Sequence, residues 1–517
     1  MSKISTSLLL AFSLGAAIVP QAWAWTLPEA ELPLGSAGLQ EERSTEDVVP
    51  GVQHVHILRG GTAESQFWTI EIGFAATDAA AQNLEEKLVA AGLEPRRDPS
   101  TFSLDGKPLG HMIRSGQFAT AAEAADGMAA LVAAGLKPAL RFTGEDGGAA
   151  QGPFVVDILA IDPSRFEGSV QAALAADAVA GRETTSSIAQ RLDAIAAVNG
   201  GYFVVNETGG TPGDPAGISV IDGQVVSEAV NGRPALRLGT QFGILPDMRS
   251  DIALSFAGGA TLTADGLNRQ PGLITNCGNP GDTPLETPAH DLTCTDADEI
   301  VIFTPAFGAP LPSGPGFQAR FAADGALIAA TPALGGPVPA EGFVVQTTGS
   351  QAEALAEAAK SGAAASFDIA VSSAGETVSL GEGDYLVNGG PTLVAAGVAV
   401  AKGPTPEGWS PDMIGETDRN SFFNGWFVRR NPRTAAGVTA DGWLLLVTVD
   451  GRRPEHSLGA SIPEMGALLA ALGAKDAINL DGGGSTAMVI GQKLIGVPSD
   501  ATGERPDADA IVLLGTK

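Results

Sequence analysis

A glycine-rich segment near the C-terminus carries the most concentrated chemistry in the chain. It runs from Asn479 to Thr486, with the sequence Asn-Leu-Asp-Gly-Gly-Gly-Ser-Thr, between two short apolar runs. Glycines let backbone N–H groups approach a ligand closely or converge on an anion. The pattern predicts a strand, a tight polar loop and a second strand, with a Gly-rich hairpin that binds nothing as the alternative. The residues predicted to bind substrate are Asn479, Gly482, Gly483, Gly484, Ser485 and Thr486, around the carboxylate of Asp481.

A second segment concentrates positive charge. Residues 419–453 hold six Arg and two Asp, a local net charge of +4 (6 − 2) in a chain of net charge −29. A guanidinium group offers parallel donors to phosphate or carboxylate oxygens, so an anion is expected to bind here. Arg433 and Arg452 flank a strand predicted at 443–449, and this strand ends at Asp450. These two arginines are therefore the preferred anion ligands.

Two Asn-Gly-Gly turns elsewhere in the chain follow strand-like apolar runs. One turn follows residues 196–198 and the other follows residues 385–387. These turns and the loop at 479–486 are expected to converge on one pocket. The predicted substrate-binding residues in the two turns are Asn199, Gly200, Gly201, Asn388, Gly389 and Gly390.

Common catalytic and nucleotide-binding motifs do not occur in the sequence. There is no Gly-x-Ser-x-Gly elbow, no His-Glu-x-x-His helix and no P-loop. Ser461, Pro463 and Glu464 have the spacing of a capping box, so Glu464 is interpreted as a helix cap rather than a catalyst. We predict no metal and no cofactor.

Composition narrows the class of protein. With 30 Lys and Arg against 59 Asp and Glu, the chain lacks the basic face that nucleic acid or anionic lipid would require. Its 517 residues exceed what one core usually supports, so two or more domains are expected. The only cysteines, Cys277 and Cys294, are seventeen residues apart and predict a disulfide. A zinc site that includes His290 is the alternative.

The N-terminal part has the pattern of an exported protein. Residues 1–24 combine a positive charge, an apolar stretch and small residues before position 25, which predicts a signal peptide. The mature chain is then expected in the cell envelope, periplasmic or extracellular, without a membrane span. Residues 25–66 are interpreted as an irregular lead-in, because they hold several prolines and many acids with little periodicity.

An internal repeat follows at 67–143. Gly92 lies nineteen residues after Gly73, and Gly135 lies nineteen after Gly116, so two similar βαβ units are predicted. This region resembles the SPOR domain, which implies binding of peptidoglycan glycan strands. A polar linker is predicted at 144–152, before a large unit at 153–517.

Six segments of the large unit, in this order, resemble the phosphodiester glycosidase family. They are Asn199-Gly200-Gly201-Tyr202-Phe203, Asn388-Gly389-Gly390-Pro391, Asn431-Pro432-Arg433-Thr434-Ala435, Val449-Asp450-Gly451-Arg452, the segment from Asn479 to Ser485, and Pro498-Ser499 with Gly503-Glu504-Arg505-Pro506. The resemblance covers about 153–515 and implies a glycosidase that acts where the anomeric carbon of a sugar is joined to phosphate. An insertion around 275–380 departs from the family, and no role is assigned to residues 305–380.

The expected chemistry assigns a role to each candidate. Breaking a sugar–phosphate bond needs charge support on the departing phosphate and a carboxylate near the anomeric carbon. Arg433 and Arg452 are assigned to the phosphate, Asp481 as nucleophile or general base, and Asp450 as second carboxylate. Asn199, Asn388, Ser485 and Thr486 are expected to orient sugar hydroxyls or to line the loop. Retention or inversion of configuration stays open, because it depends on the separation of the carboxylates.

The predicted fold class is α+β. A small SPOR-like βαββαβ domain, an antiparallel sheet with two helices, is expected before a larger mixed α/β phosphodiester-glycosidase-like domain. The predicted function is an envelope hydrolase that removes a sugar of the N-acetylglucosamine type from a sugar-1-phosphodiester. A peptidoglycan-binding or glycan-binding envelope protein without catalysis is the alternative.

Overall fold

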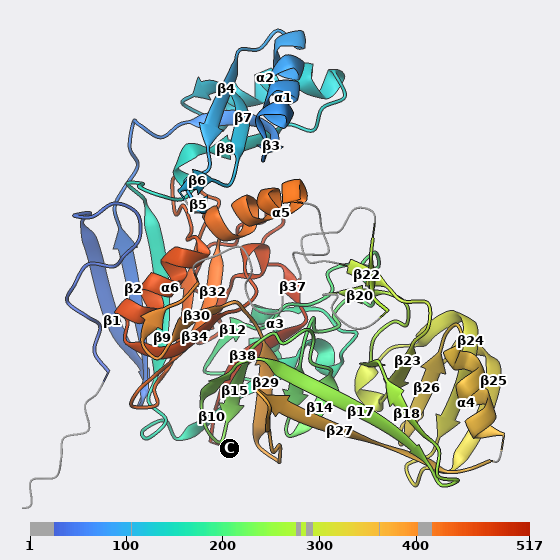
Figure 1. Cartoon of the computed structure of the whole chain (residues 1–517). Helices are drawn as coiled ribbons and strands as arrows, with labels where there is room; N and C mark the ends of the chain where they lie inside the picture. Colours follow the sequence, from blue (N-terminus) through green and yellow to red (C-terminus); the bar gives the residue numbers. More distant parts are fainter. Residues whose placement is uncertain are drawn as a thin grey trace, which may run out of the picture.

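The computed structural model describes residues 25–104, 106–275, 281–285, 293–360, 362–401 and 416–516 (Figure 1). The predicted signal peptide at 1–24 lies outside these ranges. Within them, every helix is too short or too polar to cross a membrane.

An eight-stranded sheet forms the centre of the molecule. Its strands, in spatial order, are β1 (Glu41–Val49), β2 (Val52–Arg59), β9 (Phe154–Ile161), β33 (Leu444–Val449), β32 (Arg433–Thr439), β34 (Ala474–Asn479), β30 (Thr392–Ala395) and β31 (Val398–Ala399). Every residue of β9, β32 and β33 is buried, which is why these strands are almost continuous apolar runs in the sequence.

Helix α6 (Ile462–Ala471) covers one face of this sheet. It begins at the predicted capping box: the Ser461 hydroxyl accepts from the Glu464 N–H, and the Glu464 carboxylate accepts from the Ser461 N–H. Met465 and Leu468 point from the helix into the core. The cap prediction is confirmed, and Glu464 also forms an ion pair with Arg430.

A second sheet covers the opposite face. Its order is β10 (Gly168–Leu174), β38 (Asp509–Gly515), β12 (Ala196–Asn199), β35 (Met488–Ile490) and β36 (Lys493–Leu494). Apolar side chains of the two sheets, such as Leu446 and Ile511, share one core. The loop at 480–487 joins β34 in the first sheet to β35 in the second, so the alternative of a simple Gly-rich hairpin is wrong.

A third sheet leads to a large lobe. The sheet contains β14 (Gln224–Ser227), β13 (Ser219–Ile221), β29 (Asp384–Asn388), β15 (Ala235–Gly239) and β16 (Gly243–Leu245). The lobe is connected through the long antiparallel pair β17 (Met248–Phe256) and β27 (Ala365–Ser373), and it holds the sheet of β19 (Gly266–Leu267), β23 (Ile300–Phe303), β26 (Phe343–Thr347), β24 (Leu311–Phe321) and β25 (Leu327–Gly336) with α4 (Gln351–Ala359). The described residues of the predicted insertion at 275–380 lie largely in this lobe, which begins earlier, at Met248.

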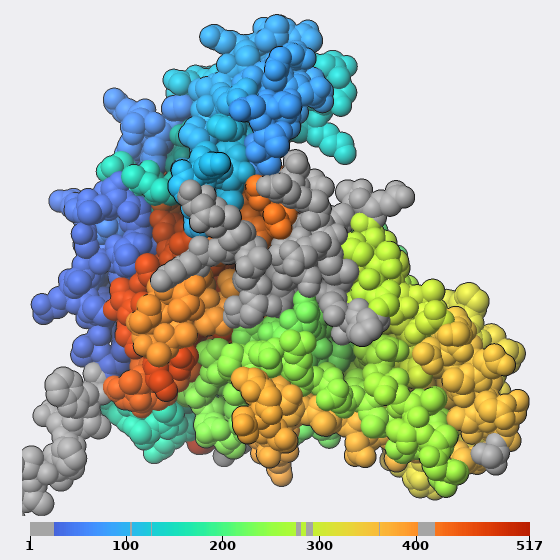
Figure 2. All heavy atoms as spheres, viewed as in Figure 1, coloured from blue at the N-terminus to red at the C-terminus, as the bar shows by residue number. Residues whose placement is uncertain are grey.

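The internal repeat forms a separate small unit, called here the N-terminal unit, residues 68–142. Its sheet has the order β4 (Pro95–Pro99), β7 (His111–Phe118), β3 (Trp68–Ala75) and β8 (Ala139–Phe142). Helices α1 (Asp78–Ala90) and α2 (Ala121–Ala133) are capped in the same way by Thr77 and Thr120. The N-terminal unit and the lobe project from different sides of the molecule (Figure 2).

The predicted α+β fold class is wrong. Strands make up 42% of the described residues and helices 16%, and the strands are spread over many small sheets. The larger part is therefore a mainly β structure rather than a mixed α/β domain. Loop-rich β proteins with Ala- and Gly-rich strands offer little periodicity to detect. A SPOR-like domain followed by an α/β domain is not retained as the description of this fold.

The predicted irregular lead-in at 25–66 is also wrong over much of its length. Residues 41–59 form the hairpin β1–β2, and β2 pairs along its whole length with β9. The acids of this region lie largely on β1, which is the exposed edge strand, where charged side chains are favourable. Composition therefore suggested an irregular segment where the chain extends the central sheet.

A buried carboxylate links this hairpin to the sheet. Asp157 on β9 accepts hydrogen bonds from the imidazoles of His54 at 2.8 Å and His56 at 2.9 Å, and His54 also bonds Glu46 at 3.1 Å. The hydrogen bond to Asp157 raises the pKa of His56, with Asp450 adding to the effect. Burial opposes the rise for His54, but Asp157 and Glu46 outweigh it, so its pKa is raised too.

Thermal stability should therefore fall as the pH rises through the range in which these histidines titrate. A raised pKa in the folded state adds stability below the unfolded value of about 6.5, and this stability is lost as the pH passes the folded value. We expect the melting temperature of the wild type to decrease from pH 5.5 to pH 8 more than that of a His54→Gln/His56→Gln variant. His111→Gln, in the N-terminal unit, is the control. Identical profiles for all three proteins would contradict the prediction.

Candidate functional site

Three strand ends of the central sheet meet at one edge. Because β32 is antiparallel to both β33 and β34, the start of β32 lies beside the ends of its two neighbours: Arg433 is paired with Val449, and Ala435 with Asn479. Arg433 opens β32, while Arg452 and Asp481 follow β33 and β34. Sheet register therefore brings together residues that lie up to 48 positions apart (481 − 433) in the sequence.

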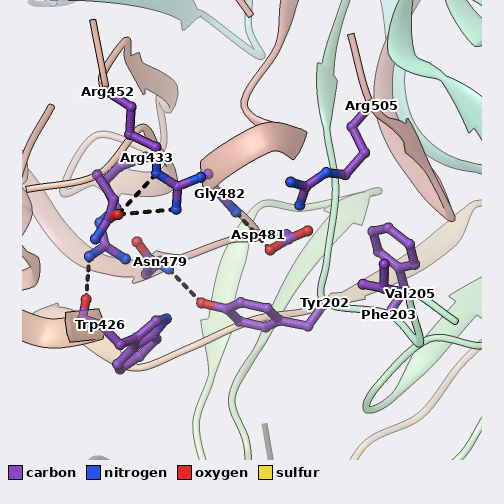
Figure 3. Close-up of a pocket in the computed structure, with 12 residues that line it drawn as sticks. Tyr202, Phe203, Val205, Trp426, Arg433, Arg452, Asn479, Asp481, Gly482 and Arg505 are labelled. Atoms are coloured by element: carbon purple, nitrogen blue, oxygen red, sulfur yellow. Dashed lines mark hydrogen bonds between the residues drawn. The ribbon is translucent and has the colours of Figure 1, made fainter. Parts of the chain in front are cut away.

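These three side chains line one cavity of about 260 Å³ (Figure 3). Arginines and Asp481 occupy one part of its wall and aromatic side chains another. The lining residues are Tyr202, Phe203, Val205, Trp426, Asn431, Arg433, Arg452, Asn479, Asp481, Gly482, Gly483 and Arg505.

Arg433 is almost completely buried, with 3% of its surface exposed. Its Nε donates to the carbonyl of Ala460 at 3.0 Å, and its Nη2 donates to the carbonyl of Trp426. No carboxylate lies within ion-pair distance of this guanidinium in the described part of the chain. Burial lowers the pKa of Arg433 to about 10, which still leaves it charged at neutral pH. A buried positive charge at a cavity without a carboxylate partner favours binding of an anion.

Glycines of the 479–486 loop make room for two further arginines. A Cβ on Gly483 would lie 3.2 Å from Arg452 Nη2, and one on Gly484 would lie 2.2 Å from Arg505 Nη2. Gly483 also has a φ of +63°, which L-residues rarely adopt. Arg452 is held by Asn431, whose Oδ1 accepts from Nε at 3.2 Å and from Nη2 at 3.1 Å. The glycine run is needed to bring guanidinium groups close to Asp481.

Asp481 is the one carboxylate among the cavity-lining residues that the structure describes. Its Oδ1 accepts the N–H of Gly482 at 2.8 Å. Its backbone is held on both sides, because its N–H donates to Gly200 at 3.2 Å and its carbonyl accepts from Asn199 Nδ2 at 2.9 Å. The carboxylate therefore has a fixed position beside the three arginines.

Most of the predicted substrate-binding residues lie behind the cavity instead of lining it. Asn199 is fully buried and bonds Asp481, Thr434 and Ala487. Asn388 bonds both backbone groups of Tyr202, at 3.0 and 3.2 Å. Those absent from the cavity wall are Asn199, Gly200, Gly201, Asn388, Gly389, Gly390, Gly484, Ser485 and Thr486. Asparagine after a strand marks a turn scaffold as readily as a ligand contact, which explains the difference.

The glycines of the two Asn-Gly-Gly turns have a packing reason. A Cβ on Gly201 would lie 2.6 Å from Asn388 Nδ2, and one on Gly389 would lie 2.7 Å from the carbonyl of Asn479. The N–H of Gly390 donates to the same carbonyl at 2.7 Å. The turns at 199–201 and 388–390 thus converge behind the Asp481 loop, where they support the site.

Asp450 also lies outside the cavity wall. Its Oδ2 accepts from His456 Nε2 at 2.7 Å and from the N–H of Val497 at 2.8 Å, and it is 5% exposed. The structure therefore does not place Asp450 and Asp481 as two carboxylates across one cavity. Asp450 and Asp481 both follow a strand in the sequence, and this pattern does not show which carboxylate faces the cavity and which faces a neighbouring loop.

The arginine-rich segment does not act as a single basic patch. Arg429 forms ion pairs with Glu71 and Asp146, and Arg430 forms one with Glu464. These two arginines are neutralised inside the protein. Of the six arginines of the segment, Arg433 and Arg452 line the cavity and remain candidates for binding an anion.

Two buried carboxyl groups near Asp481 were not predicted. Asp509 accepts the N–H of Gly201 at 2.9 Å, and burial raises its pKa to about 6. Burial and the charge of Asp481 raise the pKa of Asp507 well above its usual value. Asp507 lies on β37 (Pro506–Asp507) and Asp509 begins β38, next to the family segment at 503–506.

Sequence reasoning also missed the aromatic wall. Tyr202 donates its hydroxyl to the carbonyl of Gly390 at 2.8 Å and receives the Asn479 amide at 2.6 Å. Trp426 lies on a π-helical turn, Asn424–Val428, which no sequence pattern indicated. The family resemblance could have identified four of the missed cavity residues, because the quoted segments contain Tyr202, Phe203, Asn431 and Arg505.

The described residues contain no group of three or more His, Cys, Asp or Glu arranged to hold a metal ion. Cys294 is buried, whereas Cys277 lies outside the described ranges, so their pairing stays a prediction. The same is true of the zinc alternative, because His290 also lies outside the description.

Comparison with known proteins finds a family model that matches part of the chain and two similar solved structures. Residues 317–514 match the family model of phosphodiester glycosidases. A crystal structure from Burkholderia pseudomallei, of a protein assigned as exported, is 38% identical, with a TM-score of 0.87 over 95% of this chain and 100% of that one. A hypothetical protein from Synechocystis shares the fold, with a TM-score of 0.53 at 17% identity over 94% of this chain and 81% of that one.

A curated relative is matched only in part. The bovine (Bos taurus) N-acetylglucosamine-1-phosphodiester alpha-N-acetylglucosaminidase is 38% identical over 85 residues, which are 16% of this chain and 16% of that protein. The match therefore spans about a sixth of the length of this relative.

Proposed function

We propose that this protein is an exported hydrolase. The premise is that the chain belongs to the family of the Burkholderia protein and carries a phosphodiester glycosidase domain. Its substrate is a sugar-1-phosphodiester on an envelope glycan or exopolysaccharide, and it releases a sugar of the N-acetylglucosamine type. The name of the bovine relative supports the sugar, and the composition of the cavity supports the phosphate.

The observation that carries the proposal is that the buried guanidinium of Arg433 and the carboxylate of Asp481 line the same cavity. Arg433 lacks an ion-pair partner among the described residues, and Arg452 is bonded only to the neutral side chain of Asn431. A phosphate group would supply the missing negative charge with oxygens that match the planar donors of arginine. A sugar ring can pack against the aromatic wall while its phosphate meets the arginines.

The proposed reaction breaks the bond between the anomeric carbon and the phosphate oxygen. The departing phosphate keeps the electron pair, and arginine donors stabilise its growing charge. Asp481 either attacks the anomeric carbon and is later displaced by water, which loses one proton to solvent, or it takes a proton from water that attacks directly. In both routes the water oxygen ends on the sugar and the phosphate leaves as an anion. A phosphate leaving group needs little protonation, so one carboxylate in the cavity is sufficient.

A non-catalytic glycan-binding protein is the rival proposal, and turnover separates the two. The full-length protein would be incubated with a panel of sugar-1-phosphodiesters, including N-acetylglucosamine-1-phosphate esters and teichoic-acid-like fragments. Free reducing sugar would be quantified. Release of sugar supports the hydrolase. Binding of N-acetylglucosamine 1-phosphate in calorimetry, without release of sugar from any member of the panel, would favour the rival.

We also propose that the N-terminal unit brings the enzyme to peptidoglycan. Its internal repeat, with matched helices after Thr77 and Thr120, supports a dedicated module rather than a decoration of the catalytic fold. We expect the full-length protein to pellet with purified peptidoglycan, and more so after amidase treatment exposes glycan strands. Asp481→Asn should pellet equally, because that residue lies in the other part of the molecule. Failure to pellet with either preparation would refute this role.

A further inference from the structure

The N-terminal unit contacts the segment that forms one wall of the cavity. This segment, called here the wall segment, comprises α5 (Glu416–Phe423), the π-helical turn Asn424–Val428 and residues 429–430. It carries Trp426, which lines the cavity. In Figure 1, α5 lies below the N-terminal unit, and it contacts β3 of that unit.

Buried ion pairs join the two parts. Arg429 of the wall segment donates to Glu71 on β3 at 3.2 and 2.6 Å. Arg114 on β7 donates to the same carboxylate at 3.0 and 2.8 Å, and both arginines also bond Asp146. Burial opposes ionisation of Glu71, but Arg429 and Arg114 outweigh it and lower its pKa. Glu71 is therefore a charged link between the sheet of the N-terminal unit and the wall segment.

The N-terminal unit also contacts the residues on both sides of Trp426 in the sequence. Ser100 donates its hydroxyl to Asn424 Oδ1 at 2.7 Å, two residues before the tryptophan. Phe427, one residue after it, has an edge-to-face contact with Phe102 at 5.8 Å between ring centroids. The backbone that carries Trp426 is thus held between residues of the N-terminal part and the central sheet.

The wall segment in turn holds Arg433. The carbonyl oxygen of Trp426 accepts from Arg433 Nη2, and that of Arg429 accepts from the same atom at 3.5 Å. The guanidinium also lies 5.8 Å from the centroid of the Trp426 ring. A shift of the wall segment would therefore move an aromatic side chain and an arginine of the cavity together.

We infer that Glu71 is a positioning residue for the cavity: through Arg429 it holds the wall segment, and thereby Trp426 and Arg433, in the geometry that accepts a phosphate-bearing sugar. The N-terminal unit is then a part of the catalytic apparatus as well as a separate module. The ligand in this inference rests on the proposed function, whereas the link between Glu71 and the wall segment does not.

The test compares two glutamate substitutions in the same unit. Glu71→Gln keeps the shape of the side chain and removes its charge. Glu85→Gln removes a more exposed ion pair, with Arg97, on α1 and serves as the matched control. In full-length protein, Glu71→Gln should increase amide hydrogen exchange of residues 424–430, raise KM about tenfold and lower kcat by a smaller factor. KM rises because a displaced wall segment weakens substrate binding, and kcat falls because a displaced Arg433 stabilises the departing phosphate less well. Glu85→Gln should change none of these quantities.

Ser100→Ala provides a second, milder variant if Glu71→Gln does not fold. It should also increase exchange at 424–430 and raise KM, by about threefold.

Unchanged exchange in both variants would overturn the inference. Increased exchange with unchanged KM would reduce Glu71 to a structural residue. If the wild type turns over no substrate, the proposed function fails, and hydrogen exchange together with calorimetric binding of N-acetylglucosamine 1-phosphate still decides whether Glu71 positions the wall.

Discussion

Asp481→Asn is expected to lower kcat by about 10³ or more on any sugar-1-phosphodiester that the wild type hydrolyses. A positioned general base contributes roughly 10² to 10⁴ in rate, and a nucleophile cannot be replaced by an amide. Asparagine keeps the size of the side chain and an oxygen that can accept the N–H of Gly482, and two further bonds of this residue use its backbone N–H and carbonyl groups. The fold should therefore persist. The measurement is release of reducing sugar under saturating substrate, with circular dichroism to verify folding.

Asp441→Asn is the matched control for this experiment. Asp441 lies in the turn between β32 and β33, at the opposite end of the same sheet, and is exposed. It should retain wild-type activity. A folded Asp481→Asn protein with at least a tenth of wild-type kcat would remove Asp481 from the chemistry. The buried carboxyls Asp507 and Asp509 would then become the next candidates, since both interact electrostatically with Asp481.

Arg433→Lys should lower kcat/KM by about 10², because lysine keeps the charge but cannot offer parallel donors to a phosphate. The structure adds a second expectation. The Nε and Nη2 groups of Arg433 satisfy the buried carbonyls of Ala460 and Trp426, so the variant should also lose stability, by about 1–3 kcal/mol.

Arg452→Lys separates the two effects. Arg452 is exposed and bonds only Asn431 among the described residues, so its substitution should leave the melting temperature unchanged. If both arginines contact the phosphate, Arg452→Lys lowers kcat/KM without a loss of stability. Kinetic constants would be measured well below the melting temperature of each variant. Wild-type kinetics for a folded Arg433→Lys protein would assign Arg433 to structure and leave Arg452 as the phosphate ligand.

The sequence identified residues that bear charge at strand ends but not the direction in which they point. Asp450 and Asp481 both follow buried strands, yet Asp481 lines the cavity while Asp450 bonds His456 and the N–H of Val497. This difference arises from the paths of two loops, which depend on packing between distant segments. The helix cap at Ser461 was predictable, because capping depends on residues within one turn.

The other errors have two causes, weak local patterns and contacts between distant segments. The predicted α+β fold class was wrong because short strands rich in Ala and Gly carry little periodic signal. The hairpin at 41–59 was missed because its charges lie on an edge strand, where composition resembles that of an irregular segment. Trp426 was missed because its position depends on a π-helical turn fixed by Ser100 and Phe102, more than three hundred residues earlier.

The hairpin of β1 and β2 has a practical consequence for shortened forms of the protein. It pairs through β2 with β9, a strand buried on both faces, and its outer strand presents acids to water. Removal of residues 25–66 would leave the apolar β9 as an open edge, with unpaired N–H and C=O groups ready to add another strand. Any truncated fragment that starts at the internal repeat should thus self-associate, and its insolubility would say nothing about the catalytic fold.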